Sequence, residues 1–555
     1  MPNLTVVEFG LRLAVFSGKT QRMIMRGFVG LMLALLVFSG SGCDKSGSKS
    51  NPAPKISNLA DSAANTIARV HWLGKKRIFS DTNAVGLMAI WNLPESARLE
   101  AQTVERLASA PWRLLLKQSG TNDGSLLLRP LIQQLIEDEC YVEVSETTNQ
   151  TRDFVLAIQQ TDSAAALWQS NLAAVVELLT RIQPGKPADG ASGWSLKKHD
   201  VPDLIEFSRA GAWTLIGMAQ ETNRLQTIIK ARIARSGTPV LSEATTNWIE
   251  GHLEVARLMP SNTISSVVSA LNFSVSGEAG NVRTRGSIVT RGTTIGELEP
   301  WIIPTNFVDG SFGSFTAVRG IRPLLERSKI WNPLRSGPAP NQAWIWALQG
   351  ALMQTYLAAP LSGGSNQMHQ LSEDVMQLAD KYLPNRDIAG FRRSQVFNGL
   401  EWQGFPFMSP FIRSTTEEGN EFLLAGFFPF TSPAQILPLE LTEMLMTRTN
   451  LVMYDWELTG PRIEQWIYMS QFCRVVCQKA QLPADSAGLK WLQALVPHLG
   501  NSATELTRTG PDQFSFSRKS AAGFTGIELN LLADWLESSE FPRGLHTLLA
   551  PAKQP

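Results

Sequence analysis

Short runs of alternating apolar and polar residues, set between amphipathic helical segments, most constrain how this chain of 555 residues can fold. Several runs stand in pairs around turn residues, as at 271–275 and 282–289 around Gly277 and Gly280. Runs joined by a short turn predict hairpins, whereas a doubly wound parallel sheet needs strict strand–helix alternation. We therefore expect an α+β fold, an antiparallel or mixed sheet with packed helices.

The order of these elements recurs in the two halves of the chain. A hairpin followed by a helix occurs at 204–235 and again from 405 onward. This recurrence predicts an internal duplication, and a chain of this length exceeds the roughly 250–300 residues of a single core. We assign the first half, 57–295, to one α+β domain and the second half, 296–555, to another.

Some elements can be assigned individually from their residue pattern. We expect a helix over 59–70, a strand over 86–91 and a long helix opening at Thr161. Near the C-terminus, we expect a hairpin that pairs 513–517 with 524–529, followed by a helix.

The N-terminal region contains an apolar run of 11 residues, Phe28 to Phe38, between Arg26 and a cysteine. This is the order of a secretory signal, and a membrane-spanning helix needs about 20 apolar residues. Four small residues separate the run from Cys43. A cysteine in this place resembles a bacterial lipoprotein signal, with Gly40 where that family usually has leucine.

The resemblance implies that residues 1–42 are a cleaved signal peptide and that Cys43 carries the lipid. A start at Met23 or Met25 would give a signal of ordinary length. Residues 43–56 are rich in Ser, Gly, Lys and Pro, which predicts a flexible tether. The protein is then expected in the cell envelope or periplasm, exported and anchored to the inner or outer membrane. An ordinary signal peptide and an uncleaved anchor are the alternatives.

The charge balance limits the class of partner. Residues 1–42 contain four basic residues and one acidic residue, which leaves 46 basic against 48 acidic residues in the rest. This balance, without a basic run, argues against a nucleic-acid partner. No second run approaches the length of a membrane-spanning helix. The lipid is therefore the expected membrane contact.

The sequence contains no recognisable catalytic or metal-binding motif. Six histidines occur, none in an HExxH pair, and neither GxSxG nor a well-placed GxGxxG is present. His199 and Asp200 form the best adjacent acid–base couple, but a surface loop explains them equally well. We expect no catalytic residue, cofactor or metal, and the leading hypothesis is a non-catalytic binding or scaffold protein. The alternatives are an envelope hydrolase with dispersed catalytic residues and a carrier of apolar ligands.

Three further cysteines, Cys140, Cys473 and Cys477, are too few for a disulfide scaffold. Their spacing on apolar stripes favours core packing, with a disulfide involving Cys140 or a metal site as alternatives. Tryptophan is abundant, at 16 residues against five tyrosines. Aromatic residues on proline-broken strands suggest a groove for an apolar ligand, a glycan or an envelope protein, with core packing as the alternative. The candidate groove residues are Trp344, Trp346, Trp402, Phe405, Phe407, Phe427 and Phe428.

Overall fold

The computed structural model describes most of the chain from residue 65 to residue 543. The predicted signal peptide, Cys43 and the tether lie outside the described residues. The described range has these gaps: 118–122, 148–150, 188–191, 198–203, 221, 242–245, 259–266, 293–294, 304–311, 328–330, 332–336, 351–353, 383–389, 396, 404–408, 429–438 and 477–484.

The described strands form one sheet of 19 strands, and all their pairings are antiparallel. The expected α+β class is therefore confirmed, with an antiparallel sheet. The first half contributes, in spatial order, β4 (Gly193–Lys197), β5 (Leu204–Ala210), β6 (Trp213–Ala219), β3 (Arg152–Gln159), β2 (Cys140–Glu146), β1 (Thr66–Trp72), β7 (Ile249–Leu253), β8 (Val268–Glu278) and β9 (Asn281–Thr290).

The second half continues the same sheet beyond β9. Its strands, in spatial order from the junction with β9, are β19 (Gln513–Ser520), β18 (Asn501–Gly510), β17 (Leu451–Leu458), β10 (Phe312–Arg319), β11 (Gln342–Leu348), β12 (Thr355–Pro360), β16 (Asn420–Gly426), β15 (Phe411–Glu417), β14 (Gly399–Gln403) and β13 (Gly390–Arg393).

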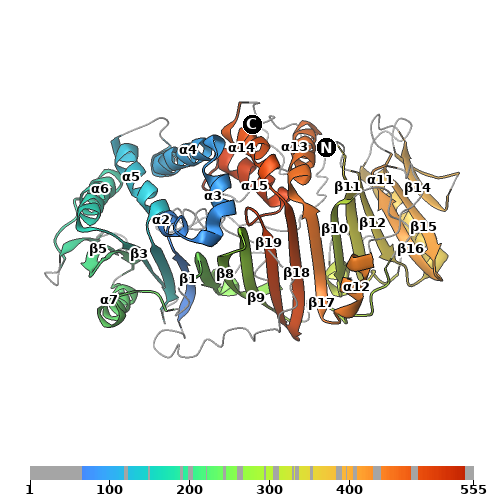
Figure 1. The fold of residues 1–555 in the computed structure, drawn as a ribbon, viewed down its shortest axis with the longest axis horizontal. Coiled ribbons are helices and arrows are strands. Elements are labelled where there is room, and N and C mark those ends of the chain that lie inside the picture. Colours follow the sequence, from blue (N-terminus) through green and yellow to red (C-terminus); the bar gives the residue numbers. More distant parts are fainter. Residues whose placement is uncertain are drawn as a thin grey trace.

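The junction between the halves, which we call the seam, is formed by β9 and β19. Val282 pairs with Ser520 at one end, and the Thr290 backbone N–H donates to the Asp512 carbonyl at 2.9 Å at the other. Figure 1 shows green β8 and β9 beside red β19 and β18. The sheet therefore runs without a break from the first half into the second.

Helices pack on the sheet and on one another. The described helices are α2 (Lys75–Ile78), α3 (Val85–Trp91), α4 (Pro94–Pro111), α5 (Asp123–Glu137), α6 (Asp162–Thr180), α7 (Arg224–Ser236), α8 (Val255–Leu258), α10 (Arg322–Arg327), α11 (Gly364–Tyr382), α12 (Leu439–Thr447), α13 (Thr459–Val476), α14 (Ala487–Leu495) and α15 (Gly526–Glu537). Among the described residues, no helix is both long enough and apolar enough to cross a membrane.

Near both ends of the molecule, helices cover the two faces of the sheet. In β3, Phe154 packs with Trp168 of α6, whereas its neighbour Val155 packs with Ile229 of α7. Successive strand residues point to opposite faces, so α6 and α7 lie on opposite sides. At the other end, Leu423 of β16 packs with α11 and the adjacent residue Leu424 packs with α12.

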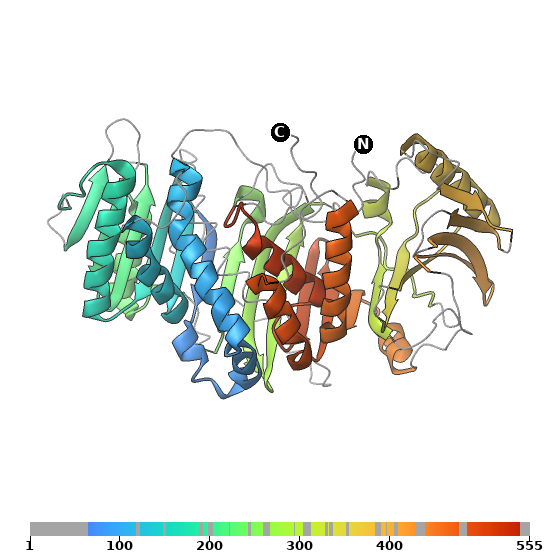
Figure 2. The same ribbon diagram turned by 90° about the horizontal axis from the view of Figure 1, so that it is seen from above.

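Over the centre of the sheet, helices of both halves form a common core. Leu99 of α4 belongs to the same buried cluster as Trp491 of α14 and Leu532 of α15. The indole N–H of Trp491 donates to the Ser96 hydroxyl at 3.1 Å, which ties α14 to the start of α4. Figure 2 shows blue α4 lying beside the red helices. The two halves are therefore joined by a helix layer as well as by the seam.

Three of the expected elements were wrong. Residues 66–70 of the expected helix over 59–70 lie in strand β1, whose residues are mostly buried on both faces, and residues 59–64 lie outside the described residues. The apolar run at 86–91 lies in helix α3, because a short apolar run fits a buried helix as well as a strand. Residues 524–529 begin α15 instead of forming a strand, and β19 pairs with β18. The hairpin of β8 and β9 and the helix from Thr161 are confirmed.

Candidate functional site

Two of the predicted groove residues are fully buried core residues. Trp344 and Trp346 are 0% and 1% exposed, and the Trp344 ring lies 5.1 Å from that of Trp301. They pack with α12 in the core of the second half. Both side chains therefore pack in the core and present no surface to a ligand.

The other groove residues are divided between the surface and the undescribed part of the chain. Trp402 is half-buried and packs edge-on against Phe391 at 4.9 Å. Phe427 is 42% exposed and Phe428 is half-buried. Phe405 and Phe407 lie outside the described residues, as do His199 and Asp200.

Cys140 is a free, buried thiol at the start of β2. Its sulfur lies 3.6 Å from the Leu135 carbonyl oxygen and 3.4 Å from that of Asp138. Burial raises the pKa of this thiol well above its ordinary value, and the charges of Asp138 and Glu139 raise it further. The residue therefore has the environment of an inert core cysteine. The side chain of Cys473 and the whole of Cys477 lie outside the described residues.

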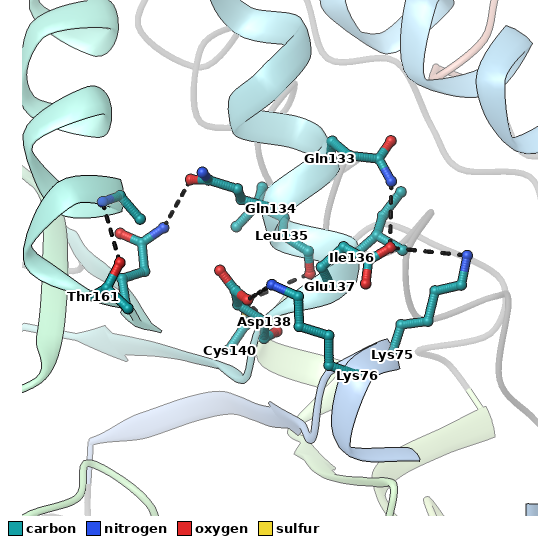
Figure 3. Close-up of polar contacts among 12 residues, drawn as sticks. Lys75, Lys76, Gln133, Gln134, Leu135, Ile136, Glu137, Asp138, Cys140 and Thr161 are labelled. Carbon is teal, nitrogen blue, oxygen red and sulfur yellow. Dashed lines mark hydrogen bonds and ion pairs between the residues drawn. The ribbon is translucent and has the colours of Figure 1, made fainter. Parts of the chain in front are cut away.

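A charged junction joins α2 to the end of α5 beside Cys140 (Figure 3). Lys76 Nζ lies 2.8 Å from Asp138 Oδ1, directly after α5, and Lys75 Nζ lies 2.9 Å from Glu100 Oε2 of α4. Figure 3 shows Lys75 directed toward Glu137, the last residue of α5, at 3.9 Å. Cations are favourable at a helix C-terminus because of the helix dipole. The junction therefore fixes α2 against α5.

His71 of β1 lies beside this junction and faces two carboxylates. Its Nε2 is 2.8 Å from Glu139 Oε1, and its Nδ1 is 3.9 Å from Glu250 Oε1. Glu139 also forms an ion pair with Arg77. Within the described ranges, no group of three His, Cys, Asp or Glu side chains is placed to hold a metal ion.

A second ionic cluster lies inside the first half, under α7. Glu143 is 0% exposed and accepts hydrogen bonds from Tyr141 at 2.7 Å, Thr66 at 3.0 Å and Arg232 at 2.9 Å. Arg232 also donates to the Pro239 carbonyl at 2.8 Å. The donors and acceptors named in this cluster satisfy one another, as a structural buried ion pair requires.

The strongest candidate for a functional site is a pair of carboxyl groups on β17, the half-buried Asp455 and the buried Glu457. They are two residues apart on one strand, so both point toward the face under α13 and α15. Asp455 Oδ1 accepts a hydrogen bond from the Thr316 hydroxyl at 2.6 Å. Glu457 Oε1 accepts one from the Gly526 backbone N–H, the first residue of α15, at 2.6 Å. The pair therefore lies between the sheet and the helix layer.

Burial perturbs both carboxyl groups, and repulsion by Asp455 adds to the shift of Glu457. Burial raises the pKa of Asp455 above its ordinary value. It also raises the pKa of Glu457 to about 7, with the neighbouring Asp455 charge as a further cause, while the Gly526 N–H opposes the rise. A carboxyl group that titrates near neutral pH can accept and release a proton under ordinary conditions.

The polar groups around the pair are unequally partnered. The Arg518 guanidinium is held by both oxygens of Glu528, at 2.5 and 3.1 Å. Arg462 donates to Gln465 at 2.6 Å, but its Nε has no hydrogen-bond partner among the described residues. Ser502, the cross-strand neighbour of Glu457, is 0% exposed, and its hydroxyl also lacks a described partner. The cluster is thus less completely satisfied than that of Glu143.

Comparisons with known proteins found only weak structural similarity. No protein-family model matches the chain, and no curated protein sequence matches it. Three crystal forms of a protein named TP0453 are weakly similar. Forms IV and III have TM-scores of 0.21, with 6% and 8% identity over 40% of this chain and 76% and 75% of theirs. Form I has a TM-score of 0.18, with 8% identity over 43% of this chain and 100% of its own. At these scores the similarity carries no argument about fold or function.

Proposed function

We propose that this protein is a non-catalytic binding or scaffold protein, held at the cell envelope by a lipid on Cys43. The observation that carries the scaffold role is the unbroken sheet, which joins residues 57–295 to residues 296–555 through the seam. The helix core of α4, α14 and α15 crosses the same boundary. Two halves joined in this way form one long, rigid body, which suits a protein that holds a partner at a distance from its anchor.

We further infer that the two halves are copies of one α+β unit. All the strand pairings of the first half have a counterpart in the second: β1–β2–β3–β6–β5–β4 and β1–β7–β8–β9 match β10–β11–β12–β16–β15–β14 and β10–β17–β18–β19. The second half adds one strand, β13, which pairs with β14 at the edge of the sheet. Each end of the sheet is covered on both faces by one pair of helices, α6 and α7 in the first half and α11 and α12 in the second. At the seam the corresponding strands β9 and β19 pair antiparallel, as expected for two copies related by a two-fold axis.

The central strands offer a polar surface for a partner. Val275 and Val282 pack into the cluster that includes α3, so their neighbours along the strands point to the other face. On that face β8 carries Ser274 and Asn272, and β9 carries Arg285, which is half-exposed at 54%. An antiparallel sheet can leave one face to solvent. This surface suits a hydrated partner, an envelope protein or a glycan, better than an apolar ligand.

The anchor is tested by intact-mass measurement on the membrane fraction of cells that express the full chain. Wild-type protein should begin at Cys43, carry an added acyl mass and sediment with membranes. Cys43→Ser should lose the added mass and leave the membrane fraction, whereas Cys140→Ser serves as the matched cysteine control and should keep both. An unmodified wild-type mass, or a Cys43→Ser protein that stays equally membrane-bound, would overturn the lipid anchor.

A further inference from the structure

Helix α15 begins directly against the sheet. Gly526 is its first residue, and Thr525 caps it by accepting from the Glu528 backbone N–H, while the Glu528 carboxylate accepts from the Thr525 N–H at 2.8 Å. The first N–H groups of a helix have no partner within the helix. Here the Gly526 N–H finds its acceptor in Glu457, at 2.6 Å. A strand residue therefore completes the start of α15.

The other end of α15 reaches the first half of the chain. Glu537 Oε2 accepts a hydrogen bond from Gln102 of α4 at 3.3 Å. Arg106 of α4 donates to the carbonyl oxygens of Leu536 and Ser538. Through α15, the position of Glu457 is thus connected mechanically to the packing between the two halves.

The charges around Glu457 do not compensate a second buried negative charge. Asp455 faces it from the same strand, Arg462 from α13, Arg518 from β19 and Glu528 from α15. Glu528 already engages Arg518 through both carboxylate oxygens, so Arg462 faces both Asp455 and Glu457. An ionised Glu457 would therefore share the Arg462 charge with Asp455, beside a Ser502 hydroxyl that has no described partner.

We propose that Glu457 is a proton-operated latch, which in its protonated form holds α15 on the sheet and against α4, and on ionisation loosens that contact. The Gly526 N–H favours the ionised carboxylate, but burial and the Asp455 charge outweigh it, and this balance sets the sign. The pKa of Glu457 in the folded protein, about 7, lies above its ordinary value, so the folded state favours the proton. The stabilisation is complete at acidic pH and is lost as the pH rises through about 7.

Hydrogen exchange of the full-length protein tests the latch. Exchange of the α15 amides, corrected for the pH dependence of intrinsic exchange, is followed from about pH 5.5 to about pH 8.5. In the wild type, protection of α15 should fall by about 30-fold over this pH range, which is part of the roughly 300-fold that a pKa shift from 4.5 to about 7 corresponds to. Glu457→Gln keeps an acceptor for the Gly526 N–H and cannot ionise, so its α15 protection should be independent of pH.

Asp153 supplies the matched control, because it is another buried carboxyl group with a raised pKa, beside the start of α7. Asp153→Asn should leave the pH response of α15 unchanged. Should Glu457→Gln fail to fold, Asp455→Asn removes the neighbouring charge and should move the midpoint to lower pH. The latch is overturned if wild-type protection is constant with pH, if Glu457→Gln retains the pH response, or if Asp455→Asn leaves the midpoint in place.

Discussion

Truncation of one leucine in α4 tests whether the two halves stabilise each other. Leu99 belongs to the first half and is 2% exposed in the core it shares with α14 and α15. Leu99→Ala removes three carbon atoms, which costs about 2–3 kcal/mol by transfer alone. The cavity left behind brings the expected loss to as much as about 5 kcal/mol. Because the cavity faces helices of the second half, we expect both halves to lose stability.

The assay is urea unfolding followed by hydrogen exchange at β3 in the first half and β12 in the second. Both strands should lose the same free energy of unfolding in Leu99→Ala. Leu126→Ala is the matched control, since Leu126 on α5 is 57% exposed and such surface changes stay within about 0.5 kcal/mol. If β3 loses stability while β12 keeps its own, the halves fold independently and the reasoning fails.

Two further substitutions test the interior of the first half and the seam. Glu143→Gln leaves the buried Arg232 without its counter-charge, and the free energy of unfolding measured in urea should fall by about 3–5 kcal/mol. A fall below about 1 kcal/mol would show that Glu143 and Arg232 do not form a buried ion pair. Gly286→Ala places a Cβ 2.2 Å from the Asn272 carbonyl oxygen of β8 and 2.4 Å from the Phe516 ring of β19, so we expect a loss of about 1–3 kcal/mol and faster exchange in both strands. Gly500→Ala, with no atom within 4 Å of its Cβ, should be neutral.

The elements that the sequence predicted correctly are those whose signals are local. The hairpin of β8 and β9 has clear alternation and glycines at its turn, and Thr161 caps α6 by accepting from the Ala164 N–H at 3.4 Å. The start of α15 carries an equally local signal, the capping box of Thr525 and Glu528, which the sequence reading overlooked. Strand β1 was missed for a different reason, because burial on both faces removes the alternation that marks a strand.

The carboxyl pair could not be recognised from the sequence. Residues 451–458 form strand β17, and charged residues that alternate with aromatic ones along a strand usually face solvent. Glu457 is buried and Asp455 is half-buried because α13 and α15 lie over that face, and α15 begins far along the chain from β17. The partners that perturb them, Arg462 and Arg518, are likewise brought together only by the tertiary fold.

The inferred duplication also accounts for the helix layer over the seam. In the first half, α3, α4 and α5 stand between β1 and β2, where the described part of the matching β10–β11 connection holds only α10. In the second half, α13 and α14 stand between β17 and β18, where the described part of the β7–β8 connection holds only α8. The long insertions thus lie at different places in the two units. They meet over the seam and bury each other in one core, so each half supplies the cover that the other lacks. On the proposed duplication, divergence of this kind would make the two copies interdependent, and the Glu457 contact lies where a local change would reach both.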